Sequence, residues 1–316
     1  MKKEDLKIVF LGTPEFAVES LDALVTNGFN IVGVVTMPDK PAGRGHKIYQ
    51  SPVKEYALEH GLHLMQPEKL KNPEFLAELQ SLNADLFIVI AFRMLPEAVW
   101  QMPRLGTFNL HASLLPKYRG AAPINWAVIN GETKTGVTTF FLKHEIDTGD
   151  IIDQVAVEIL PEENVGDIHD KLMHLGAKLT VDTVNKIIDG KLTTIPQDQL
   201  LQGTEPTPAP KIFRETCRID WNMSAEKVHN LVRGLSPYPA AWTEITINNG
   251  QSQTVKIFQT ALTDRIATVN AGTAIIEKDR LYIAAADRLL KVLSLQAEGK
   301  RRMNAADYLR GLHPNK

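Results

Sequence analysis

Short and almost uninterrupted apolar runs alternate with amphipathic stretches through the first half of this chain. Residues 6–12, 30–37 and 86–91 are such runs, and helical patterns follow them, the first of which opens at Thr13-Pro14. Strands that are apolar on both faces are typical of a parallel sheet with helices on each side. The pattern therefore predicts an α/β fold with a doubly wound, Rossmann-like parallel sheet.

The first turn of that sheet argues against a dinucleotide site. Between Leu11 and Phe16 the only glycine is Gly12, whereas the pyrophosphate fingerprint needs three glycines. Pro14 also lacks the backbone N–H group that a phosphate would bind. A nicotinamide-dependent oxidoreductase therefore stays a minor alternative.

The composition changes after residue 191. Residues 192–210 contain four prolines among many polar residues, which is typical of an extended linker. Beyond this segment, several short strand patterns lie between glycine-rich and asparagine-rich turns, which predicts a small β-barrel of the OB type. We expect a catalytic domain over 1–191, a linker over 192–210 and a C-terminal β-barrel domain over 211–316.

Charge is distributed unevenly between these parts. From Glu205 to the end there are 16 lysines and arginines against 11 aspartates and glutamates, an excess of five positive charges, although the whole chain has a net charge of −2. A basic C-terminal part would suit a polyanionic partner such as RNA. A solvated basic surface without a partner is an equally good interpretation of charge alone.

Other features limit the possible classes of protein. Cys217 is the only cysteine, so an internal disulfide is impossible, and the nine histidines are not spaced as metal ligands, so we expect no metal. The charged first residues do not resemble a signal peptide, and no apolar run reaches the roughly 20 residues that span a bilayer. We expect a cytoplasmic protein that binds no membrane.

Polar residues gather where the strand over 106–112 should end. Asn109 and His111 lie two apart, so a strand would point both side chains to the same side. Residues 113–120 contain a proline and a glycine and should form a loop at the carboxyl end of that strand. Open α/β sheets bind their ligands at this edge. A turn over Asp147-Thr-Gly-Asp150 adds a carboxylate.

The chemistry of these side chains points to acyl transfer. An amide N–H group and an imidazolium that face one point can hold an oxygen that becomes negative, and each such donor typically contributes on the order of 3 kcal/mol. A nearby carboxylate favours the protonated imidazole. Ser113 lacks the strand-turn-helix signature of a nucleophilic serine. Direct transfer from a bound donor to an amine therefore fits the trio Asn109, His111 and Asp147 better than a covalent acyl-enzyme, although each residue taken singly is more often structural than catalytic.

A cationic loop follows the second strand. Residues 37–48 are rich in proline and glycine and contain Lys40, Arg44, His46 and Lys47. Loops of this length are often functional, although a solvated loop has the same composition. Because the loop leaves the same edge of the sheet as Asn109, we favour a role in gripping the substrate.

These segments resemble the 10-formyltetrahydrofolate-dependent formyltransferases. The resemblance is carried by Asn109-Leu-His111, by Ser113-Leu-Leu-Pro-Lys-Tyr-Arg-Gly120 and by Asp147-Thr-Gly-Asp150, and it covers nearly the whole chain. It implies that 10-formyltetrahydrofolate is the co-substrate and that the trio is catalytic. It also implies that the folate is held by four residues, Ser113, Leu114, Leu115 and Pro116. Phe92-Arg93 departs from the family, in which a Tyr-Gly pair is common.

Three further segments narrow the resemblance to the branch of the family that acts on charged initiator tRNA: residues 10–17, 38–45 and 219–221. This branch implies transfer of the formyl group to the α-amine of methionine on initiator tRNA, for translation initiation. By the same analogy Lys40, Arg44 and Lys47 grip the acceptor arm, and the C-terminal domain docks on the tRNA. We expect a monomer.

Two alternatives stay open. A formyltransferase that acts on the amine of a sugar nucleotide would use the same trio, and the acceptor would distinguish it. A nucleic-acid-binding protein on a degenerate enzyme scaffold would bind tRNA without formyl transfer, but the intact trio argues against it.

Overall fold

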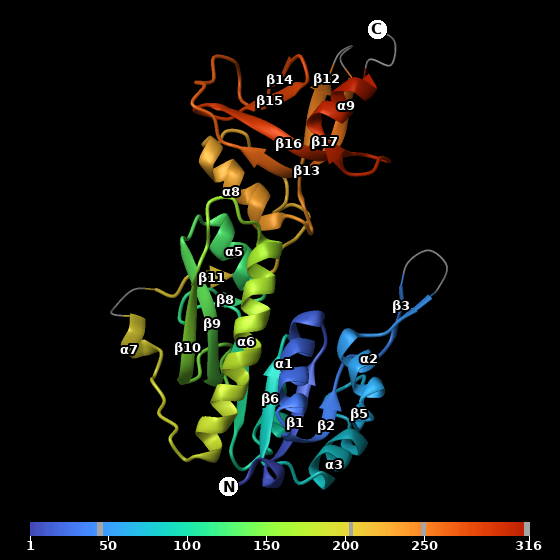
Figure 1. Cartoon of the computed structure of the whole chain (residues 1–316), viewed down its shortest axis with the longest axis vertical. Coiled ribbons are helices and arrows are strands. Elements are labelled where there is room, and N and C mark those ends of the chain that lie inside the picture. Colours follow the sequence, from blue (N-terminus) through green and yellow to red (C-terminus); the bar gives the residue numbers. More distant parts are fainter. Residues whose placement is uncertain (43–46, 202–204, 248–250, 313–316) are drawn as a thin grey trace. The chain divides into compact units, whose positions relative to one another are not determined.

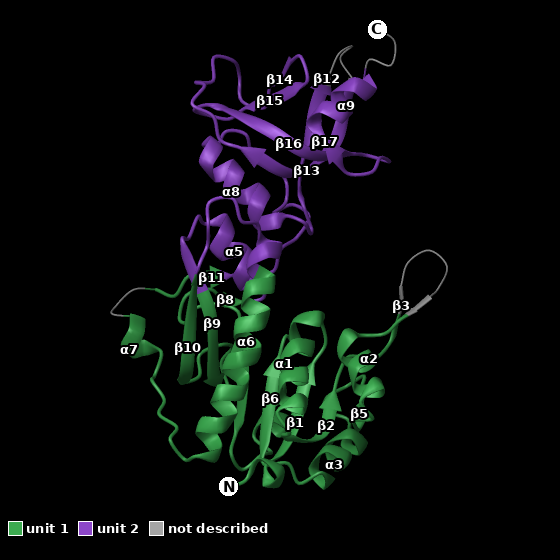
Figure 2. Ribbon diagram, in the orientation of Figure 1, with its two compact units in different colours: residues 1–120, 136–157, 169–208 green, residues 121–135, 158–168, 209–316 purple. Residues whose placement is uncertain are grey.

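The computed structural model describes residues 1–42, 47–201, 205–247 and 251–312. The chain divides into two compact units, which Figure 2 shows in different colours. Unit 1 comprises residues 1–120, 136–157 and 169–208, and unit 2 comprises residues 121–135, 158–168 and 209–316. Two earlier segments, 121–135 and 158–168, thus belong to the same unit as the C-terminal residues.

Unit 1 is built on a seven-stranded sheet with the order β10-β9-β7-β6-β1-β2-β5. The strands are β1 (Lys7–Gly12), β2 (Asn30–Val35), β5 (Leu64–Met65), β6 (Leu86–Ile90), β7 (Thr107–His111), β9 (Lys134–Phe141) and β10 (Ile151–Glu158). Neighbouring strands from β5 to β7 are parallel, whereas β9 is antiparallel to β7. The predicted doubly wound parallel sheet is confirmed.

The strand order reverses between β1 and β6, in the middle of the parallel part (Figure 1). Chain connections run to opposite sides of such a point, which leaves a crevice at the carboxyl ends of the strands. β7 is the neighbour of β6 and ends at this edge with His111.

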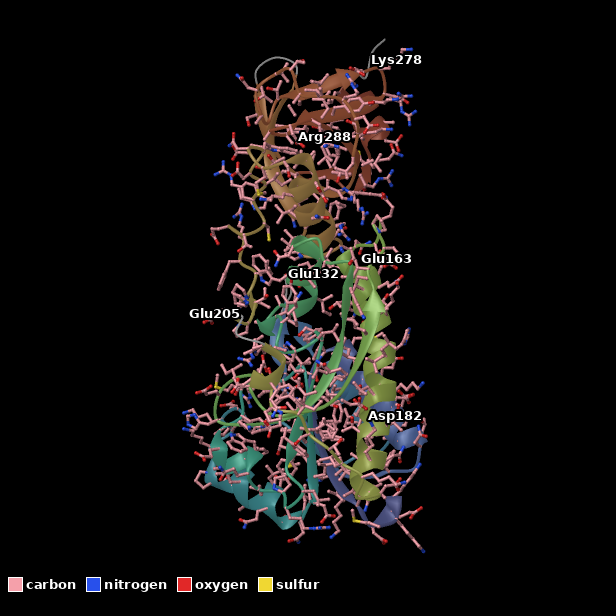
Figure 3. The ribbon with its side chains drawn as sticks, turned by 90° about the vertical axis from the view of Figure 1, so that its left-hand side faces the viewer. Glu132, Glu163, Asp182, Glu205, Lys278 and Arg288 are labelled. Carbon is pink, nitrogen blue, oxygen red and sulfur yellow. The ribbon has the colours of Figure 1, made fainter. Side chains whose placement is uncertain are left out.

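The helices of unit 1 cover both faces of the sheet. They are α1 (Glu15–Thr26), α2 (Pro52–Glu59), α3 (Pro73–Ser81), α4 (Glu97–Trp100) and most of α6 (Val165–Ile188), whose first four residues are in unit 2. Strand residues such as Val9 and Val89 share a core cluster with Phe75 of α3 and Val99 of α4. Asp182 lies exposed on α6 (Figure 3).

Local sequence explains where two of these helices begin. The Ser51 side chain accepts a hydrogen bond from the Lys54 N–H group at 3.1 Å, and the Asn72 side chain accepts one from Glu74 at 2.9 Å. Each cap is followed by a proline at the first helical position. Such capping satisfies N–H groups that a helix leaves without partners at its start.

The beginning of the expected linker is tied to unit 1. Ile195 exchanges both backbone hydrogen bonds with Ile151 at the start of β10, each 2.9 Å long, and a short helix α7 (Asp198–Leu201) follows. Prolines and polar residues in this segment indicated an extended linker. A backbone bridge to a strand more than 40 residues earlier cannot be recognised from the sequence of the segment itself. This part of the segment is therefore ordered against the sheet.

Unit 2 contains an antiparallel sheet with the order β12-β13-β16-β15-β14, and a short strand β17 pairs with β16. The strands are β12 (Ala241–Ile247), β13 (Gln251–Ala261), β14 (Ala274–Glu277), β15 (Arg280–Ala284), β16 (Leu289–Ala297) and β17 (Met303–Asn304). The terminal strands β12 and β14 also contact each other, so the sheet curves into a half-barrel. The predicted small β domain is confirmed.

Among the residues that the structure describes, three helices lie wholly in unit 2: α5 (Pro123–Ile129), α8 (Ala225–Leu235) and α9 (Ala305–Leu312). Val228 and Val232 of α8 lie in one core with Ile257, Leu295 and Tyr308. α5 packs closely on α8, because a Cβ atom added at Gly234 would lie 2.5 Å from the Ile129 side chain. Each unit therefore has an apolar core of its own.

Candidate active site

β7 carries two of the three predicted catalytic residues. In the parallel register Asn109 lies beside Val89, whose side chain packs in the core beneath α3 and α4. Phe108 and Leu110 alternate with Asn109, and Leu110 lies against Gly176 of α6 on the other face. Asn109 and His111 therefore share one face of the sheet, as predicted.

Asn109 has an uncommitted amide. The residue is partly exposed, whereas its neighbours in β7 are buried. Within the described part of the chain no residue hydrogen-bonds to its side chain. Its two N–H donors are available to a ligand at the carboxyl edge of the sheet.

His111 has one ring nitrogen committed and one available. Nε2 lies 2.8 Å from the carbonyl oxygen of Tyr118, and a carbonyl only accepts, so Nε2 carries a hydrogen. Nδ1 faces the carboxylate of Asp147 at 3.9 Å, which is too long for a direct hydrogen bond. The two side chains are 8% and 12% exposed, so their interaction is poorly screened by water. Nδ1 is therefore the ring nitrogen without a close hydrogen-bond partner among the described residues.

Asp147 is held in a turn of unusual backbone conformation. Its φ is +54°, a region that residues other than glycine seldom adopt, and its Oδ2 accepts the Gly120 N–H group at 3.0 Å. Gly149 completes the turn where a Cβ atom would lie 1.5 Å from the Phe141 carbonyl oxygen. The glycine in Asp147-Thr-Gly-Asp150 is thus required by the close approach of the two backbones.

The loop expected to hold a folate is braced by its own polar groups. Ser113 is buried and donates its hydroxyl to the Lys117 carbonyl at 2.7 Å. Thr138 donates to the Ser113 carbonyl at 2.6 Å and accepts from the Leu115 N–H group at 3.2 Å. Leu114 and Pro116 stay partly exposed. Ser113 and Leu115 therefore shape the loop, and of the four residues expected to hold the folate only Leu114 and Pro116 have accessible surface.

Two sequence profiles of known proteins match this chain. Residues 6–184 match the sequence profile of the family described as formyl transferase, and residues 211–313 match that of the formyl transferase C-terminal domain. The chain belongs to the formyl transferase family. Similar sequences include methionyl-tRNA formyltransferases from Bacteroides fragilis and Flavobacterium johnsoniae, 59% and 52% identical. The alignments cover 99% and 98% of this chain and 97% of each relative.

Solved formyl transferase structures show the same fold. The N-formyltransferase from Helicobacter canadensis, in complex with folinic acid and dTDP-3-aminofucose, has a TM-score of 0.67 and 20% identity over 92% of this chain and 99% of its own. HypX from Aquifex aeolicus in complex with tetrahydrofolic acid has a TM-score of 0.63 and 17% identity, over 97% of this chain and 47% of its own. At these identities the likeness concerns the fold alone.

The cationic loop of this formyl transferase is described only at its base. Strands β3 (Lys40–Ala42) and β4 (Lys47–Tyr49) pair as an antiparallel hairpin, and Lys40 is exposed. Arg44 and His46 lie outside the described residues, and for Lys47 only the backbone is described. No hydrogen bond or ion pair that the structure describes joins Lys40 to the trio. A gripping role for the loop stays a prediction.

The base of this hairpin is fixed to the rest of unit 1. Asp39 accepts hydrogen bonds from the Lys54 ammonium at 2.6 Å and from the Gln66 amide at 2.9 Å. These bonds, that from Lys54 first, lower the pKa of Asp39. The hairpin therefore leaves the sheet from an anchored residue.

Arg93, which departs from the family pattern, folds back onto the chain. Its guanidinium donates to the carbonyl oxygens of Glu68, at 2.8 Å, and Pro67, and burial lowers its pKa. The preceding Ala91 has a φ of +48°. Arg93 thus fastens the loop after β6 to the segment before α3 and does not present its charge to a ligand.

Gln197 is a residue of the site that the sequence did not reveal. It is 2% exposed, and its amide donates to the carbonyl oxygens of Asp147 and Gly149, both at 2.8 Å. Its oxygen accepts two hydrogen bonds from Arg119. A glutamine 50 residues after the turn, in a proline-rich segment, carries no signal in spacing or periodicity.

Neither a membrane-spanning helix nor a metal-binding group of side chains occurs among the described residues. No helix there is long and apolar enough to cross a membrane. No group of three or more histidine, cysteine, aspartate or glutamate side chains in the same part of the chain is arranged to hold a metal ion.

Proposed function

We propose that this formyl transferase moves the formyl group of 10-formyltetrahydrofolate to the α-amine of methionine on initiator tRNA, for translation initiation. The observation that carries the reaction type is the pairing of the Asn109 amide with the His111 ring on one face of β7, with the Asp147 carboxylate 3.9 Å from Nδ1. The choice of acceptor is supported by 59% identity over 99% of the chain to a methionyl-tRNA formyltransferase.

The reaction proceeds by direct attack. The amine nitrogen of the methionyl group attacks the formyl carbon, and a tetrahedral intermediate with a negative oxygen forms. An N–H group of Asn109 and the Nδ1–H group of protonated His111 donate hydrogen bonds to that oxygen, because Nε2–H is committed to Tyr118. When the intermediate collapses, the bond from carbon to N10 of the folate breaks.

The protons balance without a covalent enzyme intermediate. The attacking amine loses one proton, and N10 of the departing tetrahydrofolate gains one. Asp147 stabilises the charged form of His111, accepts the amine proton through a water molecule and returns a proton through water to N10 as the carbon–nitrogen bond breaks. Such proton transfers typically contribute about 10²–10⁴-fold to a rate.

The folate and the tRNA occupy different parts of the protein in this proposal. Ser113, Leu114, Leu115 and Pro116 form the loop that holds the folate, with the exposed parts of Leu114 and Pro116 against its rings. Lys40, Arg44 and Lys47 grip the acceptor arm. The domain over 211–316, with its linker over 192–210, docks on the tRNA, which the excess of five positive charges after residue 204 supports.

We place this activity in the cytoplasm, where charged initiator tRNA is used, and assign it to a monomer without a metal. A sugar-nucleotide formyltransferase is the second candidate, because similar solved structures include a sugar 3N-formyl transferase and an N-formyltransferase in complex with dTDP-3-aminofucose. Their identities of 21% and 20% are far below that of the tRNA enzymes, so the tRNA acceptor is favoured.

Labelled formyl transfer to competing acceptors tests the proposal. The full chain is incubated with labelled 10-formyltetrahydrofolate and one of three acceptors: charged initiator tRNA, charged elongator tRNA or a dTDP-amino sugar. We expect label on charged initiator tRNA alone. Label on the sugar alone would identify the second candidate, and tRNA binding without any transfer would indicate a degenerate scaffold.

A further inference from the structure

The side chain of Gln197 reaches the catalytic turn from a distant segment of the same unit. Ile195, two residues earlier, is bound to Ile151 by a pair of backbone hydrogen bonds, and α7 begins directly after Gln197. The backbone is therefore held in place both before and after Gln197. With 2% of its surface exposed, it has no alternative partner in bulk water.

Every hydrogen-bonding capacity of the Gln197 amide is used. Its two N–H groups donate to the carbonyl oxygens of Asp147 and Gly149, which lie at the two ends of the turn. Its oxygen accepts Nε and Nη2 of Arg119 at 3.0 and 2.7 Å. A planar amide with four partners has only one orientation that satisfies them all.

These contacts close a ring around the carboxylate of Asp147. Arg119 holds Gln197 with its side chain, and the next residue, Gly120, donates its N–H group to Asp147 Oδ2. Gln197 returns to the carbonyl of Asp147 itself. A backbone at a φ of +54° is retained only where its surroundings determine it, and this ring supplies that restraint.

We propose that Gln197, oriented by Arg119, is a positioning residue for formyl transfer, which sets the Asp147 carboxylate against Nδ1 of His111. The inference rests on the proposed function. Gln197 touches no reacting atom and acts through the turn. A displacement of about 1 Å in a catalytic group can reduce a rate about 100-fold, so a loose turn should lower kcat and leave substrate binding intact.

Gln197→Glu is the sharpest substitution. It keeps the shape and the acceptor for Arg119 but turns both N–H donors into an oxygen that faces two carbonyl oxygens. Arg119→Lys and Arg119→Met form a graded pair, because lysine retains one cationic donor and methionine retains none. Asn72→Ala serves as the control, since it removes the cap of α3 in the same unit without touching the turn.

The experiment measures kcat and both KM values for formyl transfer to charged initiator tRNA, together with the melting temperature. We expect Gln197→Glu to lower kcat by about 10 to 100-fold with both KM values within about twofold of the parent. Asn72→Ala should lower the melting temperature but keep kcat. Arg119→Lys should keep more of kcat than Arg119→Met.

The inference is overturned if Gln197→Glu keeps kcat at the level of Asn72→Ala, or if it raises KM at unchanged kcat. Should Gln197→Glu fail to fold, the Arg119 pair decides, and equal kcat values in those two variants overturn the inference. Absence of transfer by the unsubstituted protein would instead contradict the proposed function, so the two failures are distinguishable.

Discussion

The imidazole of His111 is limited to one working nitrogen by its backbone contact. Nε2 donates to Tyr118, so only Nδ1, on the side of Asp147, is left to donate to a bound oxygen. Asn109 differs because its amide makes no bond within the described residues. At the scale of single residues, His111 is held by a hydrogen bond within the protein, whereas the Asn109 amide is left for a ligand to bind.

This difference predicts the behaviour of Asn109→Ala. The substitution removes a donor to the oxyanion and breaks no bond of the folded protein, so kcat should fall about 10² to 10³-fold with an unchanged melting temperature. Single-turnover formyl transfer and thermal unfolding check the two parts. A variant with near-normal turnover would remove Asn109 from the catalytic machinery.

His229 of unit 2 predicts a dependence of stability on pH. It is 7% exposed and bonded to Thr260 at 2.9 Å, and burial, followed by the charge of Arg233, lowers its pKa. The unfolded chain, with an ordinary pKa of about 6.5, binds the proton more readily. Stability is therefore complete above that value and is lost as the pH falls below it, by at most about 1.4 kcal/mol per pH unit.

Urea unfolding at pH 7.5 and pH 5 measures this effect in the parent and in His229→Gln. The difference between the two pH values should be smaller in the variant, because glutamine can bond to Thr260 but does not titrate. The same difference in both proteins would assign the acid sensitivity to other groups.

At the scale of elements, local patterns predicted most of the architecture. Apolar runs located β1, β2 and β6. The face shared by Asn109 and His111 followed from strand alternation alone. These features depend on neighbours within a few residues, which the sequence displays directly.

What the sequence missed depends on pairing across long separations. The bridge between Ile151 and Ile195 and the bonds from Gln197 to the Asp147 turn join segments more than 40 residues apart. The proline-rich composition of that segment indicated a linker, since prolines and polar residues seldom form regular elements. The shared face of Asn109 and His111 was predictable, whereas the bonds from Gln197 to the Asp147 turn were not.

The turn after Asp147 predicts the effect of Gly149→Ala. The new methyl group would lie 1.5 Å from the Phe141 carbonyl oxygen, so the turn must move. Overpacking of this kind typically costs about 1–3 kcal/mol, and displacement of Asp147 should lower kcat as well. Chemical unfolding and initial rates measure the two effects.

Gly311→Ala provides the matched control for that experiment. This glycine lies in α9 with nothing within 4 Å of its added Cβ atom, so alanine should be neutral or stabilising by up to about 1 kcal/mol. If both glycine variants kept full activity, the close approach at Gly149 would have no catalytic consequence.

At the scale of the whole molecule, the two roles that we propose, formyl transfer and tRNA docking, fall in two units with separate cores. The trio and the folate loop belong to unit 1, whereas most of the basic C-terminal residues belong to unit 2. Contacts to phosphates release counterions, and contacts to a folate do so far less. The tRNA should therefore respond to salt much more strongly than the folate.

We predict that the KM for charged initiator tRNA rises steeply between 50 and 200 mM salt, about 10-fold or more, and that the KM for the folate changes little. Arg44→Ala should raise the KM for tRNA and reduce the slope against log salt by about one. Lys3→Ala, in the short 3₁₀ helix (Lys3–Asp5) that precedes β1, is the control. If the parent, Arg44→Ala and Lys3→Ala all showed the same slope of the tRNA KM against log salt, the cationic loop would be a solvated segment that does not bind tRNA.

The central claim is that Asn109, His111 and Asp147 transfer a formyl group to methionyl initiator tRNA. Its most direct test compares single-turnover transfer of labelled formyl by the unsubstituted protein and by Asp147→Asn, with folate binding measured alongside. The account predicts rapid transfer by the first and, with folate binding retained, a loss of about 100-fold or more in the second. Transfer at the same rate by both proteins, or by neither, would contradict it.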